Sequence, residues 1–353
     1  MKKFDYIRPA TLDEAIAAGS APGAAYLASG TNLVDLMKTG GMRPDTLVDI
    51  TRLPGLSSID TVSGGGHRIG ALVRNSDLSR DPAIVAAYPA MVEAMLSGAS
   101  GQLRNAATLG GNLAQHTRCG FFADGLSLCN RREPGSGCAA LGSGETRGFA
   151  VLGWSDSCIA THPSDLCVAL AALGAVVEIA GPSGRREVPM AEFHRLPGDA
   201  PERETVLEHG ELVIAVRLPA EAAGFAGHGR YVKLRDRTSY AFALVSVAAL
   251  LRIEGGVIAE ARLALGGVAA RPWRALTAEA LLVGAAPDRD AFAEAATAAL
   301  ADARPVEGND AKIELARRTV VRALALAAEG TPDRTPALPG SPFSSLPGDL
   351  AHV

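Results

Sequence analysis

A predicted strand, a turn of small residues and a predicted helix follow one another in the stretch Leu27-Ala28-Ser29-Gly30-Thr31-Asn32-Leu33-Val34. Small side chains at such a turn let backbone N–H groups approach an anion closely, and the start of a helix adds a partial positive charge. This chemistry suits a pyrophosphate. The same pattern is also compatible with a plain strand–turn–helix connection, so the stretch indicates an α/β unit and leaves the ligand open.

A second loop of the same character follows further along the chain, in Ala107-Thr108-Leu109-Gly110-Gly111-Asn112. Two such loops could clamp one dinucleotide, although Gly-Gly pairs also occur in ordinary turns. Neither loop has the G-x-G-x-x-G spacing of a Rossmann domain or the spacing of a Walker P-loop. If a dinucleotide binds here, we expect it to be held by a different fold.

The five cysteines are clustered, and all lie between residues 119 and 167. An odd number of cysteines without a signal peptide argues against a disulfide framework. Zinc and iron–sulfur clusters both take four thiolate ligands, and the spacing lacks both the paired C-x2-C motif typical of structural zinc and the common ferredoxin spacing. The spacing therefore predicts a four-thiolate site and leaves the metal open. The predicted ligands are Cys119, Cys129, Cys138 and Cys158.

Residues around these cysteines could donate hydrogen bonds to cluster sulfurs, as Arg118, Asn130 and the Gly135-Ser136-Gly137 turn suggest. Cys167 is excluded from the ligand set. It falls inside a predicted apolar helix over residues 163–173, where a small buried side chain is the simpler interpretation.

Composition excludes some classes of protein. The chain has 353 residues, 48% hydrophobic and 20% charged, with a net charge of −4. This balance predicts a globular chain of two or three domains, and it gives no reason to expect nucleic acid as a partner. The N-terminus lacks the apolar segment of a secretory signal, and no apolar run approaches the roughly 20 residues of a membrane span. The cytoplasm is therefore the default expectation.

Local patterns predict the order of elements. Thr11 and Glu14 form a capping-box pattern before a helix, and Gly64-Gly65-Gly66 joins two strands of a hairpin. Residues 99–160 show little periodicity, and so long an irregular stretch is normally functional. A run of Ala and Gly at residues 220–229 suggests a domain boundary. An antiparallel meander, three helices and a proline-rich tail from residue 331 are expected beyond it.

Three motifs together resemble the FAD-binding subunit family of xanthine dehydrogenase and carbon monoxide dehydrogenase. They are Ala28-Ser29-Gly30-Thr31-Asn32, the segment from Leu103 to Asn112, and Pro163-Ser164-Asp165-Leu166. The segment from Arg118 to Ala140, which carries three cysteines, is similar to the periplasmic aldehyde oxidoreductase branch. In that branch the flavin subunit holds an additional [4Fe–4S] cluster. The resemblance covers the chain from Phe4 to about Ala328.

The resemblance implies an α+β fold. A two-subdomain FAD-binding domain of the vanillyl-alcohol-oxidase/PCMH type is expected over residues 1–222, with a [4Fe–4S] insertion at about 115–160. A carbon monoxide dehydrogenase flavoprotein C-terminal-like domain, of antiparallel sheet and helices, is expected over residues 223–330, with the tail over residues 331–353.

The resemblance also implies the sites. It implies that residues 27–34, with Thr108, Gly111 and Asn112, bind the FAD pyrophosphate. It also places Asp165 and Lys233 beside the flavin. It gives the cluster to Cys119, Cys129, Cys138 and Cys158. Taken alone, Asp165 could simply favour a helix N-terminus, and Lys233 could lie on a solvated face. Asn32 stands where the family leads us to expect Asp, which changes the local charge by one.

The function implied is electron transfer. Oxidative hydroxylation of an aldehyde is expected at molybdenum in a large partner subunit. Electrons would pass through two [2Fe–2S] clusters of a small partner subunit to FAD in this chain, and then to an external acceptor. The chain alone is not expected to oxidise aldehydes. The resemblance also allows a second compartment, the periplasm, reached by export of the folded complex on a partner's twin-arginine signal.

Two alternatives stay open. One is the flavin subunit of another molybdenum hydroxylase, of the hydroxybenzoyl-CoA reductase or carbon monoxide dehydrogenase type. The other is a zinc-braced, non-catalytic scaffold subunit.

Overall fold

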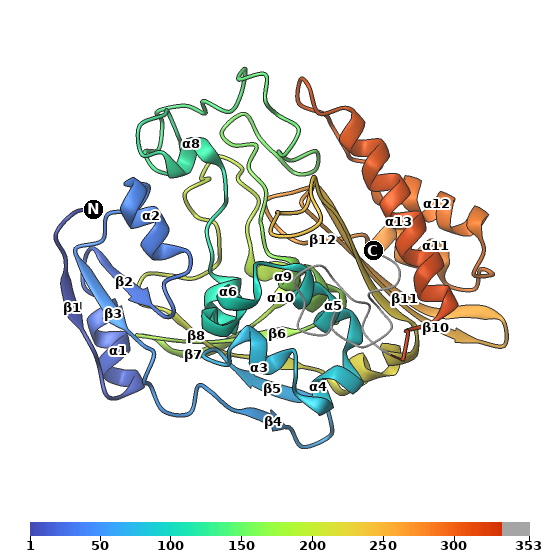
Figure 1. Ribbon diagram of the computed structural model, residues 1–353, viewed down its shortest axis with the longest axis horizontal. Helices are drawn as coiled ribbons and strands as arrows, with labels where there is room; N and C mark the ends of the chain where they lie inside the picture. Colours follow the sequence, from blue (N-terminus) through green and yellow to red (C-terminus); the bar gives the residue numbers. More distant parts are fainter. Residues whose placement is uncertain (334–353) are drawn as a thin grey trace.

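The computed structural model describes residues 1–333 of the chain, so most of the predicted tail lies outside the described residues. Figure 1 shows three sheets with helices around and between them. The N-terminal elements, in blue, lie at one end of the molecule, and the C-terminal helices, in orange and red, lie at the other. The predicted α+β fold, a two-part FAD-binding-type region followed by an antiparallel sheet with helices, is confirmed.

The first sheet is parallel and small. Its strands β1 (Asp5–Ile7), β3 (Thr46–Asp49) and β2 (Ala24–Leu27) lie in that order. Helix α1 (Leu12–Gly19) begins with the predicted capping box, in which Thr11 and Glu14 satisfy each other's backbone N–H groups. Helix α2 (Leu33–Thr39) ends at Gly40, whose φ of +87° is left-handed. This sheet places the turn at residues 28–32 at its edge.

The second sheet is antiparallel, with strands in the order β4 (Ile59–Thr61), β5 (His67–Gly70), β8 (Leu212–Leu218), β6 (Val176–Gly181) and β7 (Gly184–Pro189). Strand β8, which begins at residue 212, lies between β5 and β6 and pairs with both, so it joins the two hairpins into one sheet. Helices accompany it in chain order: α3 (Asn75–Leu78), α4 (Pro82–Ala87), α5 (Pro89–Ser97), α6 (Gly101–Ala106), α7 (Leu109–Leu113), α9 (Asp165–Ala172) and α10 (Met190–Phe193).

The third sheet is antiparallel, in the order β12 (Trp273–Arg274), β11 (Val257–Gly266), β10 (Val245–Glu254) and β9 (Gly229–Leu234). The 3-10 helix η1 (Ala220–His228) leads into it. Strand β10 is buried on both faces. Val245, Val247 and Ala249 pack with the helices α11 (Leu276–Leu282), α12 (Arg289–Ala299) and α13 (Ala311–Glu329), whereas Ala248 and Leu250 belong to the core that contains α5 and α9.

Helix α9 lies between the second and third sheets. All eight of its residues are buried, and its core includes β6, β8, β10 and β11. A helix that is apolar on every side must be covered on every side. The covering brings the start of α9, with Ser164 and Asp165, to the interior junction of the two sheets.

The cysteine-rich segment is irregular from residue 124 to residue 164, as predicted, but the earlier part is not. Helices α6 and α7, with α8 (Gly120–Ala123), occupy much of residues 101–123, so the prediction of an irregular chain from residue 99 is wrong there. These helices have four to six residues, which is too short for a hydrophobic period to show in the sequence.

The third sheet and its helices hold the end of this segment. Val151 and Leu152 donate to Val268 O, and His162 N donates to Ala269 O. Lys312 of α13 is buried and donates through Nζ to Gly148 O at 3.1 Å and Phe149 O at 2.6 Å. Within residues 1–333, no helix combines the length and the hydropathy needed to cross a bilayer.

The buried amine of Lys312 makes stability depend on pH. Burial lowers the pKa of Lys312 from 10.5 to about 7. Between these values the unfolded chain holds a proton that the folded chain lacks, so this contribution to stability rises with pH. Lys312→Met lacks this titrating group. We therefore expect the free energy of unfolding of the wild type, relative to that of Lys312→Met, to rise by up to about 1.4 kcal/mol per pH unit above pH 7.

Thermal unfolding of both proteins from pH 6.5 to 9 measures this difference. Lys38→Met, on the exposed surface of α2, is the matched control and should follow the wild type. A difference between wild type and Lys312→Met that does not change with pH would show that Lys312 keeps its proton when folded.

Candidate functional site

The largest cavity of the site lies where the two predicted loops, the start of α9 and the loop after β9 come together. Its volume is about 530 Å³. Six of the residues predicted to bind FAD line it: Thr31, Asn32, Gly111, Asn112, Asp165 and Lys233. The other seven do not line it and instead shape the two turns: Leu27, Ala28, Ser29, Gly30, Leu33, Val34 and Thr108.

The first loop contains hydrogen-bond donors that have no partner within the described residues. Gly30 has a φ of +76°, which turns the chain from β2 into α2. Among the described residues, no hydrogen-bond partner is found for the backbone N–H groups of Thr31, Asn32 and Leu33. The Asn32 side chain accepts from His116 N at 2.8 Å through Oδ1, which leaves its Nδ2 buried without a partner in the described structure. This loop can therefore take an anion without first giving up a hydrogen bond.

The second loop contributes shape more than donors. Leu109 N and Gly110 N donate to Val73 O and Ala71 O, and Gly111 N donates to Thr108 Oγ1. A Cβ on Gly110 would lie 2.9 Å from Ala71 Cβ, so only glycine fits. A Cβ on Gly111 would lie 4.0 Å from Ala28 Cβ. The two loops are thus neighbours, as predicted, and the glycines allow their backbones to approach.

Two further polar side chains of the cavity were not identified in the sequence. Asn75 and Arg104 are buried and line the cavity, and Asn75 Oδ1 and Arg104 Nη2 lack partners within the described residues. The other terminal nitrogen, Arg104 Nη1, donates to Gly98 O at 2.6 Å and fixes the guanidinium. Unpaired buried polar atoms are costly, so their convergence on one cavity indicates a polar ligand. A dinucleotide, with phosphates, hydroxyls and ring nitrogens, fits this set.

Asp165 and Lys233 form a buried ion pair, with 2.7 Å between Lys233 Nζ and Asp165 Oδ2 and side-chain exposures of 7% and 4%. Tyr231 donates to Asp165 Oδ1 at 2.7 Å, and Lys233 also donates to Ser97 O. Burial, with the adjacent Asp165 carboxylate, raises the pKa of Tyr231 well above its usual value, so Tyr231 remains a donor. The pair joins α9 to β9 at the cavity wall.

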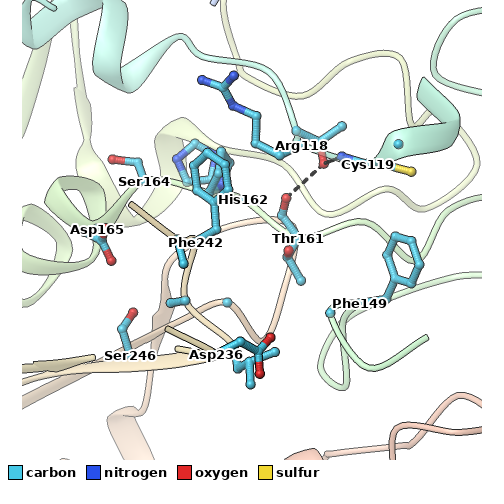
Figure 2. Close-up of a pocket in the computed structure, with 18 of the residues that line it drawn as sticks. Arg118, Cys119, Phe149, Thr161, His162, Ser164, Asp165, Asp236, Phe242 and Ser246 are labelled. Atoms are coloured by element: carbon cyan, nitrogen blue, oxygen red, sulfur yellow. Dashed lines mark hydrogen bonds between the residues drawn. The ribbon is translucent and has the colours of Figure 1, made fainter. Parts of the chain in front are cut away.

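A second cavity of about 370 Å³ adjoins the first (Figure 2). Arg118, Ser164, Asp165 and Phe242 line both. Figure 2 shows Asp165 on one side and Cys119 on the other. Arg118 lies over the Phe242 ring, 5.3 Å from its centroid, and donates to Gln115. The prediction that Arg118 donates to a cysteine sulfur finds no support in this placement.

All four predicted ligand cysteines line one small, mostly apolar cavity beside these two. Cys129 and Cys138 are paired in an isolated antiparallel β-bridge, and Cys158 lies on a second turn. Asn130 Oδ1 accepts from Gly135 and Gly137, so Asn130 organises the turn and does not donate to sulfur. The donors to Cys158 Sγ are Arg131 Nε at 3.2 Å and Ala160 N at 3.5 Å. Arg131 was missed because nothing in the sequence separates it from Arg132.

As the side chains stand, the four sulfurs are placed to hold neither a single ion nor a cluster. No three of them, all within the described chain, lie within 4.8 Å of one another. One tetrahedral zinc at about 2.3 Å from each sulfur would bring them to about 3.8 Å. The enclosed volume is about 10 Å³, room for about one water, so a cluster enters only if the cysteine side chains turn outward. The donor set fits a four-thiolate centre.

Cys167 is not among the residues lining the cysteine cavity. It is fully buried in α9, and burial raises the pKa of its thiol to about 12. Its sulfur lies within 4.8 Å of ring nitrogens of His162 and His194. Burial lowers the pKa of His194 to about 4 and that of His162 as well. The buried Cys167 thiol keeps its proton, and His194 Nε2 lies 2.9 Å from Leu113 O, so these three side chains pack as part of the core.

Comparison with known proteins places the chain in a family. Residues 2–221 match the model of the FAD binding domain in molybdopterin dehydrogenase, and residues 230–328 match that of the CO dehydrogenase flavoprotein C-terminal domain. The aldehyde oxidoreductase FAD-binding subunit PaoB of Escherichia coli (strain K12) is 48% identical over 92% of this chain and 98% of its own. The carbon monoxide dehydrogenase medium chain of Hydrogenophaga pseudoflava is 29% identical over 91% and 96%.

A solved structure agrees. Quinoline 2-oxidoreductase from Pseudomonas putida 86 superposes with a TM-score of 0.71 at 27% identity, covering 93% of this chain and 97% of the matched chain. Both loops of the cavity lie within the region that matches the FAD-binding model, whereas Lys233 and the residues after β9 that line it lie in the region that matches the C-terminal model. The chain therefore belongs to the family of FAD-binding medium subunits of the xanthine and carbon monoxide dehydrogenases, oxidoreductase subunits of molybdenum hydroxylases.

Proposed function

We propose that this chain is the electron-transfer subunit of an aldehyde-oxidising molybdenum hydroxylase, and that it holds one FAD and one [4Fe–4S] cluster. The observation that carries the flavin site is the convergence of unpartnered buried polar atoms of Asn32, Asn75 and Arg104 on one cavity. The relative that is 48% identical is named an aldehyde oxidoreductase FAD-binding subunit. This name supports aldehyde as the substrate of the complex.

Each part of the cavity has a role in the proposal. The free amides at Thr31–Leu33 and Asn32 Nδ2 bind the pyrophosphate, while Gly111 and Asn112 close against it from the second loop. Tyr240 and Phe242 also line the cavity and offer aromatic surface to a flat ring. The Asp165–Lys233 pair places one fixed positive group beside that ring. The bound flavin supplies two-electron and one-electron chemistry, and the protein positions and shields it.

The cysteine site holds the cluster in this proposal. All four cysteines line one cavity, and Arg131 Nε and Ala160 N already donate to Cys158 Sγ. Hydrogen bonds to ligand sulfurs tune such centres. Its iron would serve as an electron relay or would order residues 124–164.

The partners in the proposal are a large subunit with the molybdenum cofactor and a small subunit with two [2Fe–2S] clusters. Electrons arrive from the small subunit at the flavin here and leave to an external acceptor. We propose the cytoplasm as the compartment of the chain itself, with export to the periplasm only in company with a partner that carries a twin-arginine signal.

The flavin site is tested by Asn32→Ala. The change removes a buried donor that has no partner within the described structure from a residue that lines the cavity, and one hydrogen bond to a charged group contributes about 1.5–3 kcal/mol. We expect the dissociation constant for FAD, measured by fluorescence of the released flavin, to rise by about tenfold or more. Lys38→Ala, on the exposed side of the same helix, should leave it unchanged. Equal retention by Asn32→Ala and wild type would remove the pyrophosphate from this loop.

The thiolate centre is tested by metal content. The purified complex should contain four more iron atoms than its [2Fe–2S] subunit accounts for, and Cys158→Ser should lose them because a ligand is missing. Cys167→Ala, which deletes the one cysteine outside the cavity, should retain them. Zinc in place of this iron in the wild-type complex would support the scaffold alternative.

The ion pair beside the cavity is tested by a double-mutant cycle. Lys233→Met leaves the Asp165 carboxylate buried without its charge partner, which typically costs about 3–5 kcal/mol. We expect a large fall in Tm for Lys233→Met, and a smaller fall when Asp165→Asn is added, since no unpaired charge then remains. If the double variant is as unstable as the sum of the two single variants, the two side chains act independently.

A further inference from the structure

A chain of four residues connects the proposed flavin site to the proposed cluster site. The first, Asn32, lines the flavin cavity, and the other three do not. Asn32 of the first loop accepts from His116 N at 2.8 Å. His116 Nδ1 lies 2.8 Å from Glu204 Oε1. Glu204 Oε2 lies 2.8 Å from Arg131 Nη1, and Arg131 Nε donates to Cys158 Sγ at 3.2 Å. We refer to His116, Glu204 and Arg131 as the bridge.

The two charged side chains of the bridge, Arg131 and Glu204, are largely buried. The exposures of the Arg131 and Glu204 side chains are 4% and 15%. The Arg131 Nη1–Glu204 Oε2 contact at 2.8 Å is an ion pair. Burial alone would raise the pKa of Glu204, but Arg131, His116 and Thr117 N together lower it to about 2. Glu204 is thus a fixed anion, and Arg131 is a fixed cation beside a ligand sulfur.

A buried ion pair is weak evidence of stabilisation, because desolvation opposes the attraction. What this pair does provide is geometry, since it adds a buried charged link between segments that are otherwise joined by single hydrogen bonds such as Ser155 Oγ to Gly198 O and Thr117 Oγ1 to Thr161 O. Glu204 is anchored to the second sheet region by its backbone, which accepts from Arg195 N at 2.9 Å. Arg131 belongs to the cysteine segment, and His116 follows the second loop. Breaking the pair would remove the charged contact that fixes Arg131 relative to Glu204.

We propose that the bridge makes the two cofactor sites interdependent: Arg131 and Glu204 are positioning residues through which a cluster on Cys158 holds His116, and hence Asn32, in the geometry that binds the flavin pyrophosphate. The inference rests on the proposed function, because it needs both cofactors. By linkage, the dependence is mutual, so loss of the cluster loosens the flavin and loss of flavin loosens the cluster loop.

The charges of the bridge predict the direction in which each substitution shifts the midpoint potential of the cluster. Removing the Glu204 anion leaves Arg131 unbalanced beside the cluster and favours the reduced, more negative cluster. Removing Arg131 does the opposite and also removes an N–H···S bond. Glu204→Gln should therefore raise the midpoint potential of the cluster, and Arg131→Met should lower it. General loosening of the fold would not move the two potentials in opposite directions.

The experiment uses the purified complex, with EPR-monitored redox titration for the cluster and fluorescence of released FAD for the flavin. Glu204→Gln should keep its iron, shift the potential upward and weaken FAD binding by about fivefold or more. Glu208→Gln, an exposed glutamate of the same loop, is the matched control and should change neither. His116→Ala, at a half-exposed position, breaks the bridge from the other side and should weaken FAD binding in the same direction.

Coupling is measured directly by adding Glu204→Gln to Cys158→Ser. The effect of Glu204→Gln on FAD binding should shrink in that background, because the cluster end of the bridge is already lost. The proposal is overturned if Glu204→Gln matches Glu208→Gln in both measurements, or if Glu204→Gln and Arg131→Met shift the potential in the same direction. A wild-type complex without flavin or additional iron would instead overturn the proposed function itself.

Discussion

Burial of helix α9 on every side is the constraint on which the site depends. Because all eight residues are covered, the carboxylate of Asp165 at its first turn enters the interior and must be paired there. Tyr231 and Lys233 provide the partners, and both lie on β9 of the third sheet. The cavity wall therefore forms only when the C-terminal sheet packs against the FAD-binding region. This explains why two regions matched by separate family models make one site.

The cysteine segment shows the opposite situation, since residues 124–164 have no helix or strand of their own. The structure holds them from outside, through Lys312 and Asn309 of the C-terminal region and through Glu204 of the second sheet region. A segment with irregular backbone can turn four thiols toward one point, which a regular helix or strand cannot do at these spacings. A bound cluster would supply the remaining order, because metal binding and folding of such loops are coupled.

Much of the fold follows from local signals. The capping box at Thr11 and Glu14 and the β4–β5 hairpin were predicted from a few adjacent residues, and the structure confirms both. Helix α9 was predicted over residues 163–173 and spans Asp165–Ala172. The adjacency of the two loops and the convergence of four cysteines were expected from motif chemistry and family resemblance. The short helices α6 to α8 were missed because one turn of helix carries no period.

The residues that complete the site could not be predicted in the same way. Arg131 meets Glu204 across 72 intervening positions, and neither residue lies in a recognisable motif. Asn75 and Arg104 show their importance only as buried atoms without partners, which is a property of the folded chain. Gly111 and Asn112, which the family resemblance gives to the pyrophosphate, line the cavity, and only the folded chain shows that their amides donate within the second loop. Tertiary packing decides such contacts.

A crystal structure of the FAD-loaded complex measures the central claim most directly. The account predicts that the pyrophosphate oxygens contact the Thr31–Leu33 amides and Asn32 Nδ2, with the flavin ring beside Lys233. A flavin bound elsewhere, with these donors still unpaired, would contradict it.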